Sequence, residues 1–194
     1  NEQLAAGSGV CGAIFEKAGP GLAEEIRNEL GHGCETGDAI TTKAYSLDAK
    51  HIIHAVAPIW VPIPSSGNQL FDAYMAVFRE ARDFGVKSIA IPSLGTGVYG
   101  WSLEEATGIA KAAIIQGLRD YPILDKIIFS CFTEESASIY SHMFATELAY
   151  GLDLRLRCPK CEKPALPISY GMPSQEAFSD PNFYSGGCIV GPGQ

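Results

Sequence analysis

Short apolar segments alternate with amphipathic segments along the first 150 residues of this 194-residue chain. The apolar segments with strand character are residues 39–42, 50–56, 88–92 and 125–132. Apolar residues recur at helical spacing in segments 20–30, 69–84, 102–119 and 134–149. Strands that alternate with helices of this length are typical of an α/β fold with a largely parallel sheet. The sequence therefore predicts such a fold for residues 1–150.

The composition changes at about Gly151. From Arg157 onward the chain is rich in Pro, Gly, Ser and Asn and shows little periodicity. We therefore expect residues 151–194 to form a separate, irregular extension. Within it, Cys158 and Cys161 form a CxxC pair, which is the spacing that supplies two thiolates to a tetrahedral Zn²⁺. A redox role would need a following helix N-terminus to lower a thiol pKa, and none is predicted there.

The net charge of −8, from 14 Lys and Arg against 22 Asp and Glu, argues against nucleic acid as a partner. No apolar run approaches the roughly 18 residues that a membrane span needs. The N-terminus has no basic region followed by an apolar stretch, so no signal peptide is predicted. The six cysteines are scattered rather than arranged as a disulfide framework. We expect a cytoplasmic protein and, because the chain opens on Asn1 without Met, a piece of a longer one.

Two Gly-rich segments, residues 7–12 and 93–100, each lead into a predicted helix. Glycine lets a backbone approach an anion closely, and helix N-termini expose unpaired amides. Two such loops on one parallel sheet could hold both ends of a diphosphate. Neither loop contains the GxxxxGK[ST] or GxGxxG nucleotide-binding pattern. On the pattern alone, an anion site and a pair of tight turns are equally compatible.

Four segments of the chain resemble, in order and spacing, segments of the macrodomain family. They are NEQLAAGSGVCGAI (residues 1–14), TGDA (36–39), HIIHAVAP (51–58) and IPSLGTGVYG (91–100). The resemblance implies a three-layer α/β/α macrodomain with a mixed, mostly parallel sheet over residues 1–150. The family has an extra pair of strands before the position of Asn1, so we expect these N-terminal strands to be missing from the chain. Their loss would expose a sheet edge.

The same resemblance implies an ADP-ribose site. The first loop would surround the distal ribose and the nearby phosphate through Gly7, Ser8, Gly9, Val10 and Cys11. The second loop would hold the diphosphate through Ser93, Leu94, Gly95, Thr96, Gly97, Val98 and Tyr99, with Tyr99 also beside the distal ribose. Phe132 would pack against adenine, although an ordinary core phenylalanine is the alternative at that position.

The family includes hydrolases, and this implies a catalytic role for Asn1 and Cys11. Asn1 aligns with an Asn that helps to position the attacking water. The expected substrates are mono-ADP-ribosylated acidic side chains on proteins, or O-acetyl-ADP-ribose, and the chemistry needs no metal or cofactor. Many hydrolases of the family have Asp at the position of Cys11, and a neutral thiol is a poor base. A non-catalytic ADP-ribose reader that recruits modified partners is therefore the alternative.

The GVC sequence of the first loop also resembles macrodomains of alphaviruses and rubella virus, among which hydrolases occur. Cys11 as a nucleophile is disfavoured because no His lies near it in sequence. The extension resembles the first half of small bacterial zinc ribbons, which leaves a structural zinc at Cys158 and Cys161 open for the full-length protein. A third class, nucleic-acid processing through such a ribbon, is disfavoured by the negative charge.

Several conspicuous residues are expected to be structural. His51 and His54 lie three apart on a strand, so they face opposite sides and do not share a metal. His54 is expected to be packed and hydrogen-bonded, and Asp38 to fix the turn before the first strand. Trp101 is expected to pack rather than stack on a ligand. Two cysteines, Cys34 and Cys131, are interpreted as small buried hydrophobic residues.

Overall fold

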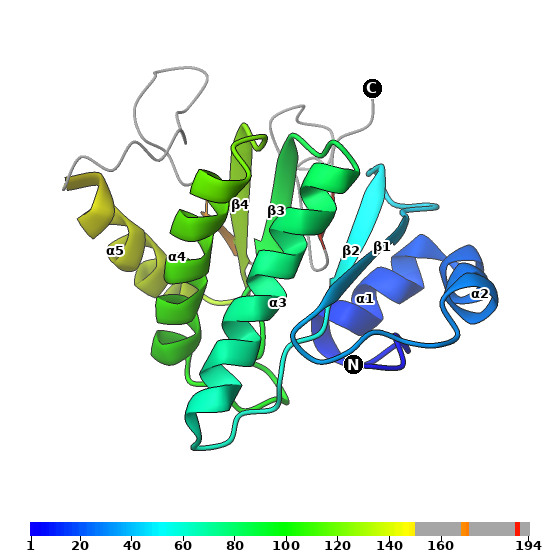
Figure 1. Cartoon of the computed structure of the whole chain (residues 1–194), viewed down its shortest axis with the longest axis horizontal. Coiled ribbons are helices and arrows are strands. Elements are labelled where there is room, and N and C mark those ends of the chain that lie inside the picture. The colour runs from blue at the N-terminus through cyan, green and yellow to red at the C-terminus, as the bar shows by residue number, and fades with distance from the viewer. Residues whose placement is uncertain (150–167, 171–188, 191–194) are drawn as a thin grey trace.

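The computed structural model describes residues 1–149, 168–170 and 189–190 (Figure 1). In chain order the helices and strands are α1 (Gly9–Ala18), α2 (Pro20–Glu29), β1 (Ala39–Lys43), β2 (His51–Ala55), α3 (Pro64–Asp83), β3 (Ser88–Pro92), α4 (Leu103–Asp120), β4 (Lys126–Cys131), α5 (Glu134–Ala149), β5 (Ile168–Tyr170) and β6 (Ile189–Val190). All four strands expected before residue 150 form, each within two residues of its predicted limits. No helix in the described ranges is long and apolar enough to cross a membrane.

The strands are arranged in the orders β1-β2-β6 and β3-β4-β5. Strands β1 and β2 pair antiparallel, whereas β3 and β4 pair in parallel with Pro92 opposite Ser130. The two short strands of the extension add β5 in parallel to β4 and β6 antiparallel to β2. Because β6 also contacts β3, it lies between β2 and β3. The expected mixed sheet with parallel strands is confirmed.

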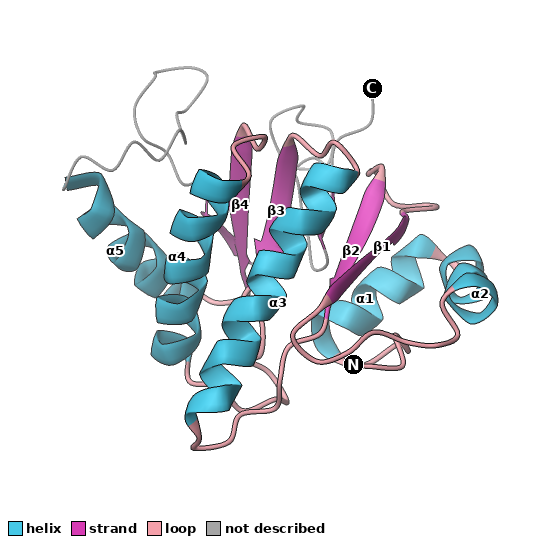
Figure 2. Ribbon diagram, viewed as in Figure 1, coloured by secondary structure: helices cyan, strands magenta, loops and turns pink. Residues whose placement is uncertain are grey.

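Helices cover both faces of the sheet (Figure 2). Successive side chains of a strand point to opposite faces, and β2 shows this directly. Its Ile53 faces a cluster formed with α3, α4 and α5, whereas its Ile52 faces a cluster formed with α1 and α2. The three-layer α/β/α arrangement is therefore confirmed.

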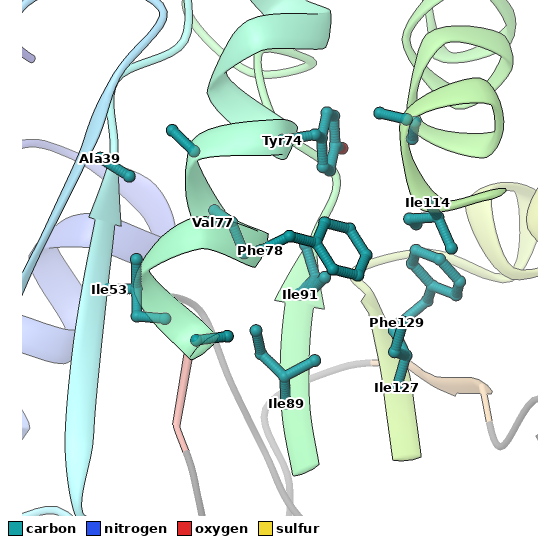
Figure 3. Close-up of a cluster of buried hydrophobic side chains, with 14 of the residues drawn as sticks. Ala39, Ile53, Tyr74, Val77, Phe78, Ile89, Ile91, Ile114, Ile127 and Phe129 are labelled. Atoms are coloured by element: carbon teal, nitrogen blue, oxygen red, sulfur yellow. The ribbon is translucent and has the colours of Figure 1, made fainter. Parts of the chain in front are cut away.

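The larger cluster lies between the sheet and helices α3 and α4 (Figure 3). Phe78 of α3, Ile114 of α4, Ile91 of β3 and Phe129 of β4 are all at most 1% exposed. Burying a side chain of this size contributes about 1.5 to 3 kcal/mol. The two helices approach so closely that a Cβ at Gly117 would lie 2.3 Å from a ring carbon of Phe78. This crossing therefore depends on glycine.

Two helices begin earlier than the sequence predicts. Helix α1 begins at Gly9, inside the Gly-rich segment expected to be a loop, and α3 begins at Pro64 rather than near residue 69. Glycine and proline weaken the helical pattern of a sequence. Proline is nevertheless tolerated in the first turn, because its missing N–H would have no partner there. The first residues of these two helices could therefore not be predicted from the sequence.

Candidate ligand-binding site

The N-terminus and the loops that follow β2 and β3 lie at the same end of the molecule, the lower end in Figure 1. The Trp60 amide donates to the Tyr99 carbonyl over 2.7 Å, which joins the loops after β2 and β3. The register of β3 and β4 places Ser93, which follows β3, beside Cys131, which ends β4, at the same edge of the sheet. The carboxyl ends of parallel strands are the usual place for a ligand in an α/β fold.

The structure brings the two predicted catalytic residues to one carbonyl group. The Asn1 side chain donates from Nδ2 to the Ala5 carbonyl over 2.9 Å and accepts from the Ala5 amide over 3.0 Å. The Cys11 thiol lies 3.9 Å from the same carbonyl oxygen. An Asn side chain has two N–H donors, so Asn1 keeps one for a ligand or water. The Asn1 side chain therefore closes the turn before the first loop, and both Asn1 and Cys11 lie beside the Ala5 carbonyl oxygen.

A contact that sequence reasoning missed anchors this N-terminal turn. The Glu2 carboxylate accepts from the Thr36 hydroxyl over 2.7 Å, and the Glu2 carbonyl accepts from the Cys34 amide over 2.8 Å. Gly33, with a φ of +78°, passes so close that a Cβ there would lie 2.2 Å from the Glu2 carbonyl oxygen. Because the partners are more than thirty residues apart, no local pattern marks Glu2.

The first loop ends in a helix start that has no side-chain cap. Ser8 is the N-cap residue of α1, but its side chain makes no capping hydrogen bond. The first amides of a helix have no partner within the helix, so those of α1 are open to an anion. Gly12 makes this turn tight, because a Cβ there would lie 2.4 Å from the Gly7 carbonyl oxygen.

The second loop is held by Trp101. The indole Nε1 donates to the Pro58 carbonyl over 2.9 Å, and the Trp101 amide donates to the Gly95 carbonyl over 3.2 Å. Gly95 has a φ of +80°, and a Cβ there would lie 2.5 Å from Cδ1 of the indole. The Trp101 side chain is 7% exposed. It is therefore the packing residue that the sequence predicts.

Five consecutive amides of this loop, those of residues 95–99, have no acceptor in the part of the chain that the structure describes. The preceding Leu94 amide, in contrast, donates to the Tyr74 hydroxyl. The helix that follows is capped, because its N-cap Ser102 accepts from the Glu105 amide. An anion would therefore meet the loop itself rather than the start of α4. Such a run of backbone amides is a common anion-binding arrangement.

Phe132 is not a core residue, because 79% of its side chain is exposed. It follows β4, between the buried Cys131 and a hydrogen-bonded turn at the start of α5. In that turn the Thr133 amide donates to the Ser136 hydroxyl over 3.1 Å, and the Ser136 amide donates to the Thr133 hydroxyl over 3.1 Å. The ordinary core alternative is thereby excluded, and the ring is free to contact a flat ligand group.

Asp38 and His54 have structural partners. Asp38 accepts from the Arg79 guanidinium and from the Ala39 amide. Burial alone would raise the pKa of Asp38, but these hydrogen bonds outweigh it and lower the pKa. His54 is buried, and its Nε2 lies 2.9 Å from the Thr42 hydroxyl. His54 is therefore packed and hydrogen-bonded, as predicted. The Asp38 side chain has a structural role as well, but it joins the start of β1 to α3 rather than fixing the preceding turn.

His54 makes the stability of the protein depend on pH. Burial lowers the pKa of His54 from 6.5 to about 4. Between these values the unfolded chain binds more protons, so the free energy of unfolding falls as pH falls from about 6.5 toward 4. We expect a loss on the order of 3 kcal/mol, measured by urea unfolding at several pH values.

The control for this pH dependence is His54→Gln, which retains a polar partner for Thr42 and does not titrate. Other groups remain unchanged, so the difference between the two proteins isolates His54. The variant should lose less stability than the wild type between pH 6.5 and 4. Equal losses in the two proteins would show that His54 does not carry the effect.

The remaining cysteines of the described ranges show no metal centre. Burial, followed by the nearby Asp38 charge, raises the pKa of Cys34 to about 11, and burial also raises the pKa of Cys131. Both thiols are therefore protonated near neutral pH. No group of three or more His, Cys, Asp or Glu side chains is placed to hold a metal within the described residues. The predicted ligands Cys158 and Cys161 lie outside those residues.

The fold and the site define a three-layer α/β/α domain with a backbone-lined site at the ends of its parallel strands. A family model described as Macro domain matches residues 1–110. The O-acetyl-ADP-ribose deacetylase of Klebsiella pneumoniae (strain 342) is 38% identical over 150 residues, covering 75% of this chain and 85% of that protein. The chain belongs to the macrodomain family.

Two solved structures show the same relationship. The Oceanobacillus iheyensis macrodomain with ADP is 36% identical, with a TM-score of 0.69, and the match covers 77% of this chain and 82% of that one. The Trypanosoma brucei macrodomain in complex with ADP-ribose is 33% identical, with a TM-score of 0.68, and the match covers 74% and 60%. The family predicted from the four sequence segments is confirmed.

Proposed function

We propose that this macrodomain binds ADP-ribose and hydrolyses the ester bond of O-acetyl-ADP-ribose or of ADP-ribose on acidic protein side chains. The observation that carries the proposal is the run of five amides, at residues 95–99, that have no acceptor within the described ranges. Neither residues 1–14 nor residues 93–101 contain Lys or Arg. A diphosphate at this site would therefore be held by backbone dipoles rather than by cationic side chains.

The proposed ligand lies across the ends of β3 and β4. Its diphosphate rests on the amides of residues 95–99, and its distal ribose lies at residues 7–11 and Tyr99. Its adenine packs against the exposed ring of Phe132. The ADP-bound and ADP-ribose-bound macrodomains described above support this class of ligand.

In the proposed reaction, water attacks the carbon of the acyl group carried by the distal ribose. The bond between that carbon and the ribose oxygen breaks, and the ribose oxygen takes up a proton. The products are free ADP-ribose and a carboxylic acid. The remaining N–H of Asn1 orients the water, and a phosphate oxygen of the ligand accepts the proton that the water loses. Cys11 shapes the pocket beside this water without acting as a base.

The test measures release and binding separately. The protein is incubated with O-acetyl-ADP-ribose, and in parallel with a glutamate-linked mono-ADP-ribosylated protein, while free ADP-ribose is quantified over time. We expect release above the no-enzyme rate, and a fall of about 100-fold for Asn1→Ala because one oriented donor is lost. The affinity of the variant for ADP-ribose, measured by calorimetry, should fall by less than about tenfold, since Asn1 also closes the turn at Ala5.

Matched control variants distinguish an effect on the candidate site from a general loss of structure. Asn28→Ala changes an exposed asparagine of α2 and should leave release unchanged. Cys11→Ala tests whether release of ADP-ribose needs the Cys11 thiol. Cys34→Ala is its matched control, because both cysteines are partly buried. Binding without release in the wild type would instead make the protein a reader, which is the function that a thiol at position 11 favours. Absence of both binding and release would refute the proposal.

A further inference from the structure

Two fully buried tyrosines meet beneath the second loop. Tyr74 comes from α3 and Tyr140 from α5, and both side chains are 0% exposed. The Leu94 amide donates to the Tyr74 hydroxyl over 3.3 Å, and the Tyr140 hydroxyl donates to the Ser93 hydroxyl over 3.1 Å. The two tyrosine side chains also lie close to each other. The two hydroxyls therefore hold neighbouring residues at the start of the second loop.

The rings of the two tyrosines lie among apolar side chains, and the buried Thr107 side chain is also near Tyr140. The Tyr140 ring packs against Phe129, with ring centroids 4.7 Å apart, and stacks on Phe144. Burial raises the pKa of both tyrosines, so both remain neutral. A buried hydroxyl costs free energy unless it is hydrogen-bonded, whereas phenylalanine would fill the same space without that requirement. The hydrogen bonds to the loop therefore explain why these two buried residues are tyrosine rather than phenylalanine.

We propose that Tyr74 and Tyr140 are positioning residues that hold the second loop in its ligand-binding conformation. Their hydrogen bonds fix Ser93 and turn the Leu94 amide toward the core. The next five amides then have no acceptor among the described residues and are available to the proposed diphosphate. The hydrogen bond from the Thr96 hydroxyl to the Ser93 carbonyl, 3.2 Å long, extends the same arrangement into the loop. This inference rests on the proposed function, because it concerns the same diphosphate.

Helix α5 contacts both the loop proposed for the diphosphate and the turn that carries Phe132, the residue proposed for adenine. Helix α5 carries Tyr140, and its first turn holds Phe132 through Thr133 and Ser136. One helix therefore positions both the loop proposed for the diphosphate and the ring proposed for adenine. A change at Tyr140 is expected to act on the diphosphate, because its hydroxyl contacts Ser93 rather than Phe132.

The test uses Tyr74→Phe, Tyr140→Phe and the double variant, with Tyr121→Phe as the matched control away from the loop. We expect each single variant to bind ADP-ribose and ADP about three- to tenfold more weakly. Adenosine, which lacks phosphates, should bind all variants within about twofold of the wild type when titrated by NMR. The double variant should bind ADP-ribose more weakly than either single variant, because the two hydroxyls hold neighbouring loop residues through separate hydrogen bonds.

Amide hydrogen exchange gives a readout that does not depend on a ligand. The Leu94 amide should exchange faster in Tyr74→Phe than in the wild type, and Tyr121→Phe should not change it. If the wild type binds ADP-ribose and the Phe variants bind it equally well, the inference is wrong and the proposed function stands. Equal weakening of ADP-ribose and adenosine would also overturn it, since that pattern indicates general loss of structure. Failure of the wild type to bind ADP-ribose would contradict the proposed function itself.

Discussion

Gly95→Ala is expected to weaken ADP-ribose binding by roughly 100-fold. The backbone at Gly95 has a φ of +80°, which an L side chain rarely adopts, and the new Cβ would lie 2.5 Å from the Trp101 ring. Because that ring is buried and hydrogen-bonded to Pro58, it cannot move aside without breaking a second contact. The loop must then rearrange, and the positions of the amides of residues 95–99 change. Calorimetry with ADP-ribose measures the loss.

The control for Gly95→Ala is Gly97→Ala in the same loop. Gly97 does not have a positive φ, and nothing lies within 4 Å of a Cβ placed there. The melting temperature of Gly97→Ala should therefore stay close to that of the wild type, whereas Gly95→Ala should melt lower. A Gly95→Ala protein with wild-type affinity would show that the loop conformation does not determine binding.

Gly117→Ala is expected to lower the free energy of unfolding by about 2 to 3 kcal/mol. The added methyl group would lie 2.3 to 2.5 Å from three ring carbons of Phe78, whose side chain is 1% exposed. The ring has no free space to enter, so α3 and α4 must separate. The higher helix propensity of alanine offsets only part of this cost, at most about 1 kcal/mol. Urea unfolding at neutral pH measures the change.

Gly108→Ala provides the matched control in the same helix. Nothing lies within 4 Å of a Cβ at Gly108, so only helix propensity changes. We expect this variant to gain about 0.5 to 1 kcal/mol of stability. Similar unfolding curves for the two variants would refute the close crossing of α3 and α4 at Gly117.

Much of the fold could be predicted from the sequence because its elements carry strong local patterns. The run Ser88–Pro92 is apolar on both faces, as a buried parallel strand requires, and it forms β3. Ser102 caps the predicted helix by accepting from the Glu105 amide, and α4 begins at the next residue. The starts of α1 and α3 could not be placed, because Gly9 and Pro64 weaken the helical signal and only tertiary packing offsets this.

The candidate site was predictable only in part. Both loops were recognised from their glycines. The structure brings Asn1 and Cys11 to one carbonyl oxygen, and their roles toward a ligand stay predictions. The sequence did not indicate that the Leu94 amide faces Tyr74, because that contact joins residues twenty positions apart. Tyr140 was missed for the same reason, since its contact with Ser93 joins residues 47 positions apart. Their proposed role remains a prediction until the phenylalanine variants are measured.

The unpaired amides of residues 95–99 have a consequence for how this surface can diverge among proteins. A ligand that is bound by main-chain amides does not depend on the identity of the side chains in the loop. Val98, for example, is 83% exposed and can be replaced without loss of packing. Constraint falls instead on residues such as Gly95 and Trp101, which determine the path of the chain. Substitutions at Val98 would therefore alter what surrounds the ligand without removing the amides that hold it. Specificity could change in this way while the capacity to bind a diphosphate is retained.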